Sequence, residues 1–371
     1  MSAALRSALV FGSAITSSRH NGAAVFFRGL CRALARTGLT VTFAEQSQPV
    51  EPDEGIPAGI RVQRYKMPAD VREIMAETEP PRLLVKFVAC GTLDAAVERV
   101  LLFQREASDV AVFVDGDAPA SLESIRLSPE HPSRATLSRF DGVLVLAGGE
   151  AAAAQFLSFG ARRVRWGYCG VDERFWRPVP PSVDLVCDLL FAGNRLADRE
   201  ARVREFFLRP ASLCPDRRFL LAGSGWEEAY LPANVRVLGH LRPAELRRAY
   251  ASAGLVLNVN REPMARYGYA PASRLFEAAA CGAGIVSDRW PGIEAILAPG
   301  EEVLLADGAA DVVRAVREVA PALRRRIGLA ARRRIERDYT CDGWVRWLLA
   351  TLAEWGLVDA LSVVGAERED D

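Results

Sequence analysis

The chain has 371 residues, of which 50% are hydrophobic and 25% are charged, so it can bury two cores and is not a wholly disordered chain. Its 47 basic residues balance 47 acidic ones, and this zero net charge gives no reason to expect nucleic acid or another polyanion as a partner.

The seven cysteines and the apolar runs indicate in which compartment the protein works and whether it carries a zinc site or a membrane span. No cysteine lies in a CxxC or Cys/His zinc pattern, and scattered thiols in apolar runs are typical of a reducing compartment. The apolar part of the N-terminus is short for a signal peptide, and no run approaches the roughly 18 residues of a membrane span. The basic segments 324–326 and 332–334 have few apolar neighbours and indicate a solvated face. We therefore expect a cytoplasmic protein without peripheral membrane contact.

The first half of the chain alternates short apolar runs with stretches of helical periodicity. Residues 7–12 (SALVFG) predict a strand and residues 22–37 a helix. Further strands are predicted at residues 40–45, 83–89, 110–115 and 142–147. Continuous apolar strands between helices indicate a parallel sheet covered on both faces, so we predict a doubly wound α/β domain over residues 1–175.

A proline-rich segment, residues 172–183, indicates an interdomain linker. The alternation then resumes, with strands predicted at 188–193, 218–223, 235–241, 254–260, 284–288 and 302–306, and helices at 197–208, 243–252, 273–281, 309–319 and 321–337. We predict a second doubly wound domain over residues 184–338. Residues 339–371 predict a tryptophan-rich helix (342–356) that packs back across the domains, and an acidic tail. Two such domains would face a central cleft, where ligands lie beyond the strand ends.

The segment after the strand predicted at 254–260 is the most informative. A polar loop with Arg261, Arg266 and Tyr267 leads to Ser273, which opens a helix. A helix N-terminus offers free N–H groups to a phosphate, and guanidinium groups match phosphate oxygens. Glu277, one turn further among apolar residues, needs a polar partner. That partner is either the vicinal hydroxyls of a ribose or, as a structural alternative, Arg274 on the same helix face. We assign Glu277, Arg274 and Ser273 to the donor site, together with Arg261 and Tyr267.

The run SRLFEAAACGAGIVSD, followed by PGIEAIL and GEEVLL, resembles the C-terminal signature of bacterial CgeB-like glycosyltransferases, a branch of the two-Rossmann-domain (GT-B) nucleotide-sugar transferases. Four further blocks resemble that family in the same order: GSAITSSRHNGAAVFFRGLCRALARTG, VFVDGDAPASLESI, RFDGVLVLAGGEA and DLLFAGNRLADR. The resemblance spans most of the chain.

The resemblance implies glycosyl transfer from a nucleotide-diphosphate sugar to an acceptor hydroxyl. It implies Glu277 on the ribose, with Arg261, Asn194 and Arg195 near the diphosphate. Many retaining relatives carry a second glutamate eight residues before the first, where this chain has Tyr269, so that contact to the donor sugar is absent or rebuilt.

Other residues at predicted strand ends are also candidates. Asn194 and Arg195 lie between a strand and a helix, which suits a phosphate, or else a solvated helix-entry turn. Asp288 follows a strand and would line the donor sugar. Asp115 and Asp117 end a strand, and three roles are open to them. One of them would act as the general base, or the pair would hold a metal ion, or both would form a turn before the next helix. We favour the metal least.

Two glycine-containing turns complete the candidate set. In the loop SSRHNG, His20 would be a base or an acceptor contact, or else a solvated histidine. Asn21 would lie on the acceptor side, and the backbone at Gly22 would approach the donor. Gly148 and Gly149 are assigned to the acceptor side.

No GxGxxG follows the first strand, so no dinucleotide cofactor is expected. We expect a metal-independent enzyme without a cofactor, whose domains close about the linker and exclude water. A nucleotide-sugar epimerase and a non-catalytic sugar-nucleotide-binding protein are the alternatives. No pattern specifies the oligomeric state.

Overall fold

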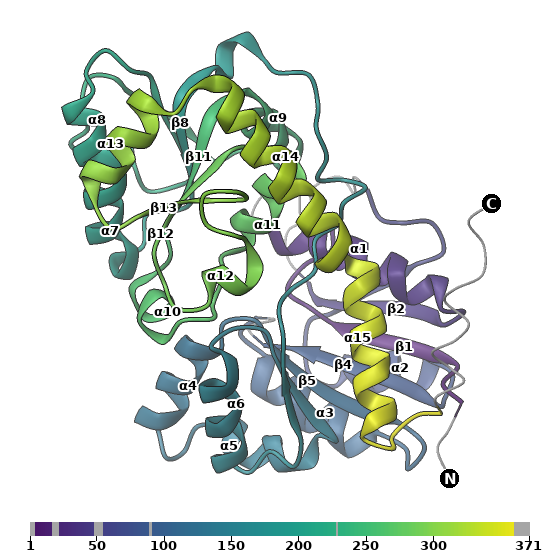
Figure 1. Ribbon diagram of the computed structural model, residues 1–371. Coiled ribbons are helices and arrows are strands. Elements are labelled where there is room, and N and C mark those ends of the chain that lie inside the picture. The colour runs from purple at the N-terminus through teal and green to yellow at the C-terminus, as the bar shows by residue number, and fades with distance from the viewer. Residues whose placement is uncertain (1–3, 17–21, 48–54, 89–90, 228, 360–371) are drawn as a thin grey trace. The chain divides into compact units, whose positions relative to one another are not determined.

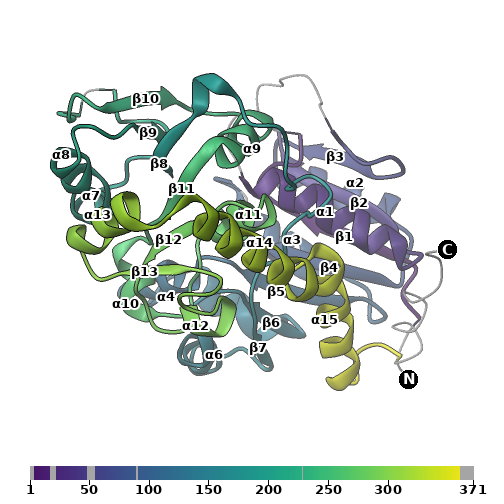
Figure 2. The ribbon, with the colours of Figure 1, turned by 45° about the horizontal axis from the view of Figure 1, so that its top comes forward.

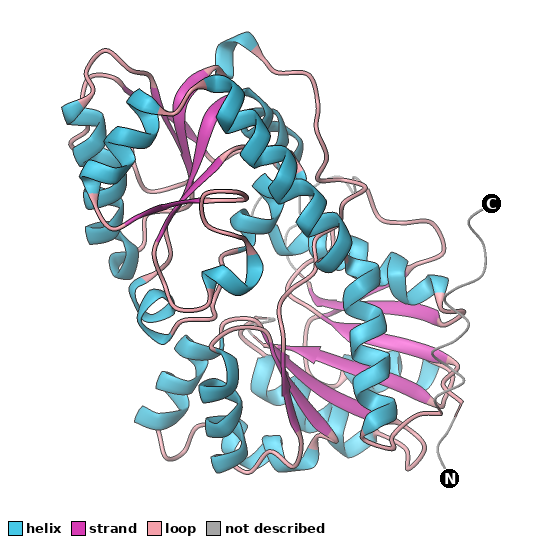
Figure 3. Ribbon diagram, in the orientation of Figure 1, coloured by secondary structure: helices cyan, strands magenta, loops and turns pink. Residues whose placement is uncertain are grey.

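The computed structural model describes residues 4–16, 22–47, 55–88, 91–227 and 229–359 (Figure 1). The chain divides into two compact units. The first comprises Met1–Asp172 and Cys341–Asp371, and the second comprises Glu173–Thr340. Helices alternate with strands along both (Figure 3).

The first unit contains a seven-stranded sheet with the order β3-β2-β1-β4-β5-β6-β7. Its strands are β1 (Ser7–Phe11), β2 (Thr40–Gln46), β3 (Arg61–Tyr65), β4 (Arg82–Phe87), β5 (Val110–Asp115), β6 (Gly142–Val145) and β7 (Val164–Trp166). Every pairing is parallel. The strand order reverses between β1 and β4, so this sheet is doubly wound, as the sequence predicted.

All residues of β1, β4, β5 and β6 are buried, which explains why these strands are visible in the sequence as unbroken apolar runs. The edge strands β3 (RVQRY) and β7 (VRW) were not predicted. Most of their residues are partly exposed, so their sequences carry no apolar run.

Helices of the first unit are α1 (Gly22–Arg36), α2 (Asp70–Glu77), α3 (Asp94–Gln104), α4 (Ala118–Leu127), α5 (Ser133–Thr136), α6 (Gly149–Ser158) and α15 (Cys341–Glu354), with the 3₁₀ turn η1 (Leu137–Arg139). The C-terminal helix α15 belongs to this unit and lies beside α1 (Figure 2). Trp344, Leu348 and Leu352 of α15 are buried in the same core as Leu30 and Leu34 of α1. Burying such side chains stabilises a fold by about 1.5–3 kcal/mol each.

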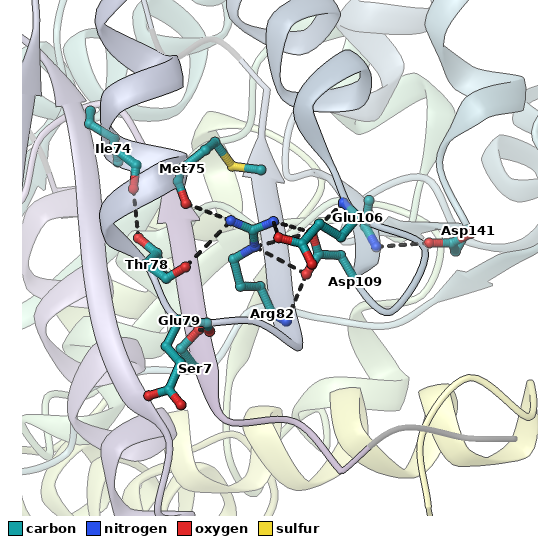
Figure 4. A network of polar contacts seen from close by, with 10 residues as sticks. Ser7, Ile74, Met75, Thr78, Glu79, Arg82, Glu106, Asp109 and Asp141 are labelled. Atoms are coloured by element: carbon teal, nitrogen blue, oxygen red, sulfur yellow. Dashed lines mark hydrogen bonds and ion pairs between the residues drawn. The ribbon is translucent and has the colours of Figure 1, made fainter.

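A buried ion-pair network secures the amino ends of β4 and β5 (Figure 4). Arg82 Nε and Nη2 donate to Asp109 at 3.0 and 2.7 Å, and Arg82 Nη1 donates to the Met75 carbonyl at 2.5 Å. The backbone N–H groups of Arg82 and Glu106 donate to the same carboxylate. The carboxylate is therefore fully hydrogen-bonded, and the network is structural.

The second unit contains a six-stranded parallel sheet with the order β10-β9-β8-β11-β12-β13. Its strands are β8 (Cys187–Ala192), β9 (Phe219–Ala222), β10 (Val235–Gly239), β11 (Ala253–Asn258), β12 (Ile285–Asp288) and β13 (Leu304–Ala306). All six were predicted, with ends that differ by at most two residues.

The helical segments of the second unit are η2 (Val183–Leu185), α7 (Ala197–Val203), η3 (Arg204–Leu208), α8 (Arg209–Leu213), α9 (Pro243–Ser252), α10 (Glu262–Tyr267), α11 (Ser273–Ala280), α12 (Ile293–Ile296), α13 (Ala309–Glu318) and α14 (Pro321–Asp338). The polar loop predicted after β11 was partly wrong, because it contains α10. Two features of the sequence account for that helix: Pro263 stands in its first turn, where a missing N–H costs nothing, and Gly268 ends it at φ 76°. No helix among the described residues is long and apolar enough to cross a membrane.

Candidate functional site

The candidate site lies at the carboxyl ends of β8 and β11, the two central strands of the second sheet. These two strands pair with each other in the middle of the sheet. The chain continues from β8 to β9 and β10 on one side, and from β11 to β12 and β13 on the other side. The segments that leave β8 and β11 therefore diverge, and such a switch point is where open α/β sheets bind ligands.

Glycines bring two backbone segments together at this point. Gly223, after β9, has φ 128°, and a Cβ atom there would overlap the Gly193 carbonyl. Asn194 Oδ1 accepts a hydrogen bond from Ser224 N at 3.0 Å, and Arg195 N donates to Ser224 O at 2.9 Å. Asn194 and Ser224 are both exposed. The ends of β8 and β9 thus form a backbone-lined surface that a bulky ligand can approach.

Three arginines converge on the same edge, and each is paired with a carboxylate. Arg195 binds Glu200 at 2.9 Å and Arg261 binds Asp198 at 2.8 Å. The Arg195 and Arg261 side chains retain 32% and 28% exposure, so both can also meet a ligand. Arg202, which the sequence analysis missed, binds Asp288 at 2.6 Å. In α10, Arg266 is exposed and Tyr267 is half-buried.

Asp288 does not line an open surface, contrary to the sequence-based assignment. It has no exposed area, and besides Arg202 it accepts a hydrogen bond from Asn260 N at 3.1 Å. Burial raises the pKa of its carboxyl group, and the bond from Arg202 opposes that rise. Asp288 therefore joins the ends of β11 and β12 to α7 and stabilises the carboxyl edge of the second sheet.

The Arg274 side chain also holds strand ends together. Its Nε donates to the Ala192 carbonyl and its Nη1 to Asn258 Oδ1 at 3.3 Å, so one side chain joins the ends of β8 and β11. The guanidinium lies 4.9 Å from the Phe191 ring centre, and burial lowers its pKa. No direct ion pair joins Arg274 and Glu277, which are both among the described residues, but the Arg274 charge lowers the pKa of Glu277, so the structural alternative stays open as a charge interaction.

Glu277 instead has hydroxyl partners. Tyr250 donates to Glu277 Oε2 at 3.3 Å, and the Ser273 hydroxyl also bonds the carboxylate. Burial raises the pKa of Glu277, while the Arg274 charge and the two hydroxyl groups oppose that rise. Glu277 is 5% exposed and Ser273, one turn earlier, is exposed. The carboxylate is thus more enclosed than its place in the sequence suggested.

Tyr269, in the segment between α10 and α11, occupies a strained backbone position. Among the described residues it is the one non-glycine with positive φ, at 48°. Its N–H donates to Pro291 O at 2.6 Å, and its ring fills the space that a Cβ at Gly292 would take. The side chain is 39% exposed. The position eight residues before Glu277 therefore presents a partly exposed aromatic ring.

The aspartates of the first unit have different environments. Asp115 is buried, its Oδ1 accepts Asp117 N at 2.8 Å, and burial raises its pKa to about 7. Asp117 is exposed and immediately precedes α4. The contact supports the turn-forming alternative for Asp115, and the base role stays a prediction. No group of three His, Cys, Asp or Glu side chains within the described part of the chain is placed to hold a metal.

The glycine-containing turns are described only in part. Gly148 (φ 89°) and Gly149 (φ 59°) stand at the start of α6, in conformations that favour glycine. Gly22 is the first residue of α1. His20 and Asn21 lie outside the described residues.

Two functional candidates beyond the predicted set are Tyr250 and Asn260. Asn260 is buried, donates from Nδ2 to Ala270 O at 3.0 Å, and its Oδ1 is without a partner among the described residues. Its place directly after a strand was a usable signal. Tyr250 carried no such signal, because helical periodicity explains it as a core residue.

Residues 199–350 match the model of a family described as glycosyl transferase-like. The matched range begins in α7 and includes α10, α11 and α14. The comparison with curated proteins gives no match.

Several solved structures share the fold of the whole chain. Sucrose-phosphate synthase from Thermosynechococcus elongatus superposes with a TM-score of 0.69 at 17% identity, covering 94% of this chain and 100% of that one. HepE from Anabaena, in complex with UDP-glucose, gives 0.65 at 15% identity, covering 95% and 100%. An alpha-glucosyltransferase in complex with UDP-glucose and DNA gives 0.67 at 11% identity, covering 94% and 99%. At such identities the likeness establishes the fold alone. The chain therefore has the two-domain α/β fold of GT-B glycosyltransferases, with a glycosyl transferase-like sequence over residues 199–350.

Proposed function

We propose that the protein transfers a glycosyl group from a nucleoside diphosphate sugar to an acceptor hydroxyl, without a resident cofactor. The observation that carries this proposal is the start of α11. Its N-cap is Ala272, and no side chain caps the helix, so the first turn offers backbone N–H groups to a ligand. The glycosyl transferase-like match over this region supports the same conclusion.

The diphosphate would lie between the N-terminus of α11 and the arginines at the strand ends. Arg195 and Arg261 are partly exposed and already held by Glu200 and Asp198, so a phosphate would compete with those carboxylates for the guanidinium N–H groups. In the transition state the same donors would stabilise the negative charge on the departing diphosphate.

The nucleoside would place its ribose near Glu277. A carboxylate can accept about four hydrogen bonds, and Tyr250 and Ser273 supply two. A ribose would approach past the exposed Ser273 and either share the carboxylate with its hydroxyl or displace it. The sequence blocks that resemble CgeB-like glycosyltransferases support this finer placement.

The donor class is tested with a thermal-shift panel of UDP, dTDP, GDP and ADP sugars. We expect one nucleotide class to stabilise the protein, by about 2.7 kcal/mol at a ligand concentration a hundredfold above Kd. If no sugar nucleotide stabilises the protein, the proposed function is wrong.

The role of Glu277 is tested by calorimetry with the nucleotide that stabilises. Glu277→Ala should weaken binding by about tenfold or more, since it removes charge-assisted hydrogen bonds to the ribose. Glu301→Ala, an exposed glutamate of the same unit, is the matched control and should bind normally. Unchanged affinity in Glu277→Ala would remove Glu277 from the site.

A further inference from the structure

The side chain of Tyr250 is placed to control the orientation of Glu277. Tyr250 lies in the last turn of α9, is buried, and brings its hydroxyl to 3.3 Å from Glu277 Oε2. A buried tyrosine hydroxyl needs a hydrogen-bond partner, and a carboxylate only accepts, so the Tyr250 O–H donates. The Ser273 hydroxyl approaches the same carboxylate from α11 itself. Two elements thus hold Glu277.

The ring of Tyr250 is fixed from behind by the proline-rich segment. Trp176 is buried, with its ring centre 5.9 Å from that of Tyr250. The segment itself is anchored to α9, because Arg247 Nη1 donates to the Phe175 carbonyl at 2.7 Å and its guanidinium lies 4.8 Å from the Phe175 ring centre. Residues that the sequence indicated as a linker therefore form a packed support for Tyr250.

We propose that Tyr250 is a positioning residue for donor binding: its hydroxyl, backed by Trp176, holds the Glu277 carboxylate in the orientation that a ribose requires. This inference rests on the proposed function, since it assumes that Glu277 binds the nucleoside. Tyr250 itself need not touch the donor. Its effect on affinity then passes through Glu277, and a merely structural tyrosine would have no such dependence.

The charges around Glu277 give the proposal a second signature. The groups that face it are Arg274 and Ser273 on α11, Cys281 directly after α11, and Tyr250 on α9. Burial raises the pKa of Glu277, and the hydrogen bond from Tyr250 opposes the rise. Without that bond the pKa rises further, so the carboxylate becomes protonated at a higher pH. Donor binding should then be lost at a higher pH on acidification.

The test is calorimetry of UDP, or of whichever nucleotide the panel selects, with four forms of the full chain: the parent, Tyr250→Phe, Glu277→Gln and the double variant. We expect Tyr250→Phe to weaken binding about fivefold at pH 7.5, which is the effect of one modest hydrogen bond. In the Glu277→Gln background the same change should have no further effect. The acid limb of the affinity profile should move to higher pH in Tyr250→Phe.

Tyr339→Phe is the matched control. The Tyr339 ring packs on Phe276, next to Glu277 on α11, but its hydroxyl donates to the Ala295 carbonyl at 3.3 Å. This variant should bind UDP within twofold of the parent and keep the parent pH profile.

The outcomes separate the two proposals. Parent affinity and pH profile in Tyr250→Phe, or an equal loss in both backgrounds, would overturn the positioning role. Parent affinity in Glu277→Gln would overturn the proposed site itself. Should Tyr250→Phe fail to fold, Glu277→Asp breaks the same hydrogen bond from the other side while keeping the charge, and parent affinity in that variant would also contradict the proposal.

Discussion

Two aspartates at opposite ends of β5 have opposite environments. Asp109, at the amino end, is buried, and its carboxylate accepts hydrogen bonds from the Arg82 guanidinium, Arg82 N and Glu106 N. Asp115, at the carboxyl end, is buried too, yet its Oδ2 has no hydrogen-bond partner among the described residues. The carboxylate before the strand is thus fully hydrogen-bonded, whereas the carboxyl group at its other end is bonded by Asp117 N and the Ser121 hydroxyl and keeps one oxygen, Oδ2, without a partner among the described residues.

The second unit repeats this difference. At the amino end of β8, Asp188 accepts hydrogen bonds from Arg218 N at 2.9 Å and from the Arg217 side chain. At the carboxyl ends of β11 and β12, Asn260 Oδ1 and Trp290 Nε1 are buried without partners among the described residues. Buried polar groups are normally satisfied, and the carboxyl ends of the strands are where open α/β sheets bind ligands, so we propose Asn260 and Trp290 as candidates for ligand contact. The amino edge serves stability.

The largest expected effect is at the amino edge. Asp109→Ala removes the partner of a buried guanidinium and should destabilise the first unit by about 3–5 kcal/mol. Urea unfolding of the full chain measures this, with Glu79→Ala as control, because the exposed Arg6–Glu79 pair contributes at most about 1 kcal/mol. A loss below 1 kcal/mol in Asp109→Ala would contradict the contrast between the two edges.

A smaller effect, dependent on pH, is expected at Asp115. Its folded pKa of about 7 lies above the ordinary value of 3.8, so the native state binds more protons than the unfolded state between these values. The contribution of Asp115 to the free energy of unfolding is fully present below about pH 4 and is lost as the pH rises to about 7. The loss is on the order of a few kcal/mol. Asp115→Asn should flatten this part of the curve of unfolding temperature against pH. The exposed Asp117→Asn should leave it unchanged, and equal curves for both variants would refute the assignment.

The smallest effect on stability is expected at Arg195. Its partly exposed ion pair with Glu200 contributes less than about 1 kcal/mol, so Arg195→Met should unfold almost as the parent does. Its affinity for UDP should nevertheless fall about tenfold, because a charged hydrogen bond to phosphate is lost. Arg204→Met is the matched control, since Arg204 binds the same Glu200 but is 67% exposed. If both variants bind UDP as the parent does, Arg195 is not a phosphate ligand.

The sequence predicted the central strands of the second sheet because burial on both faces produces apolar runs, and it predicted most helices from their periodicity. It missed β3 and β7, whose residues are partly exposed at a sheet edge. It indicated Glu277 from one fact that needs no structure: a carboxylate in apolar surroundings must have a polar partner. It could not identify that partner, since Tyr250 lies 27 residues away and follows a pattern that core residues share.

The order of apolar runs and helices by itself determined that the chain forms two doubly wound α/β units, because local periodicity records which faces are buried. Only the tertiary structure decided the role of each polar residue at the strand ends. In the structure, Arg274 and Asp288 are buried and hold the strand ends together, while Arg195 and Arg261 are partly exposed. Glu277 accepts a hydrogen bond from Tyr250. The physical reason is that hydrogen bonds and desolvation depend on neighbours brought together from distant parts of the sequence, and no local pattern encodes them.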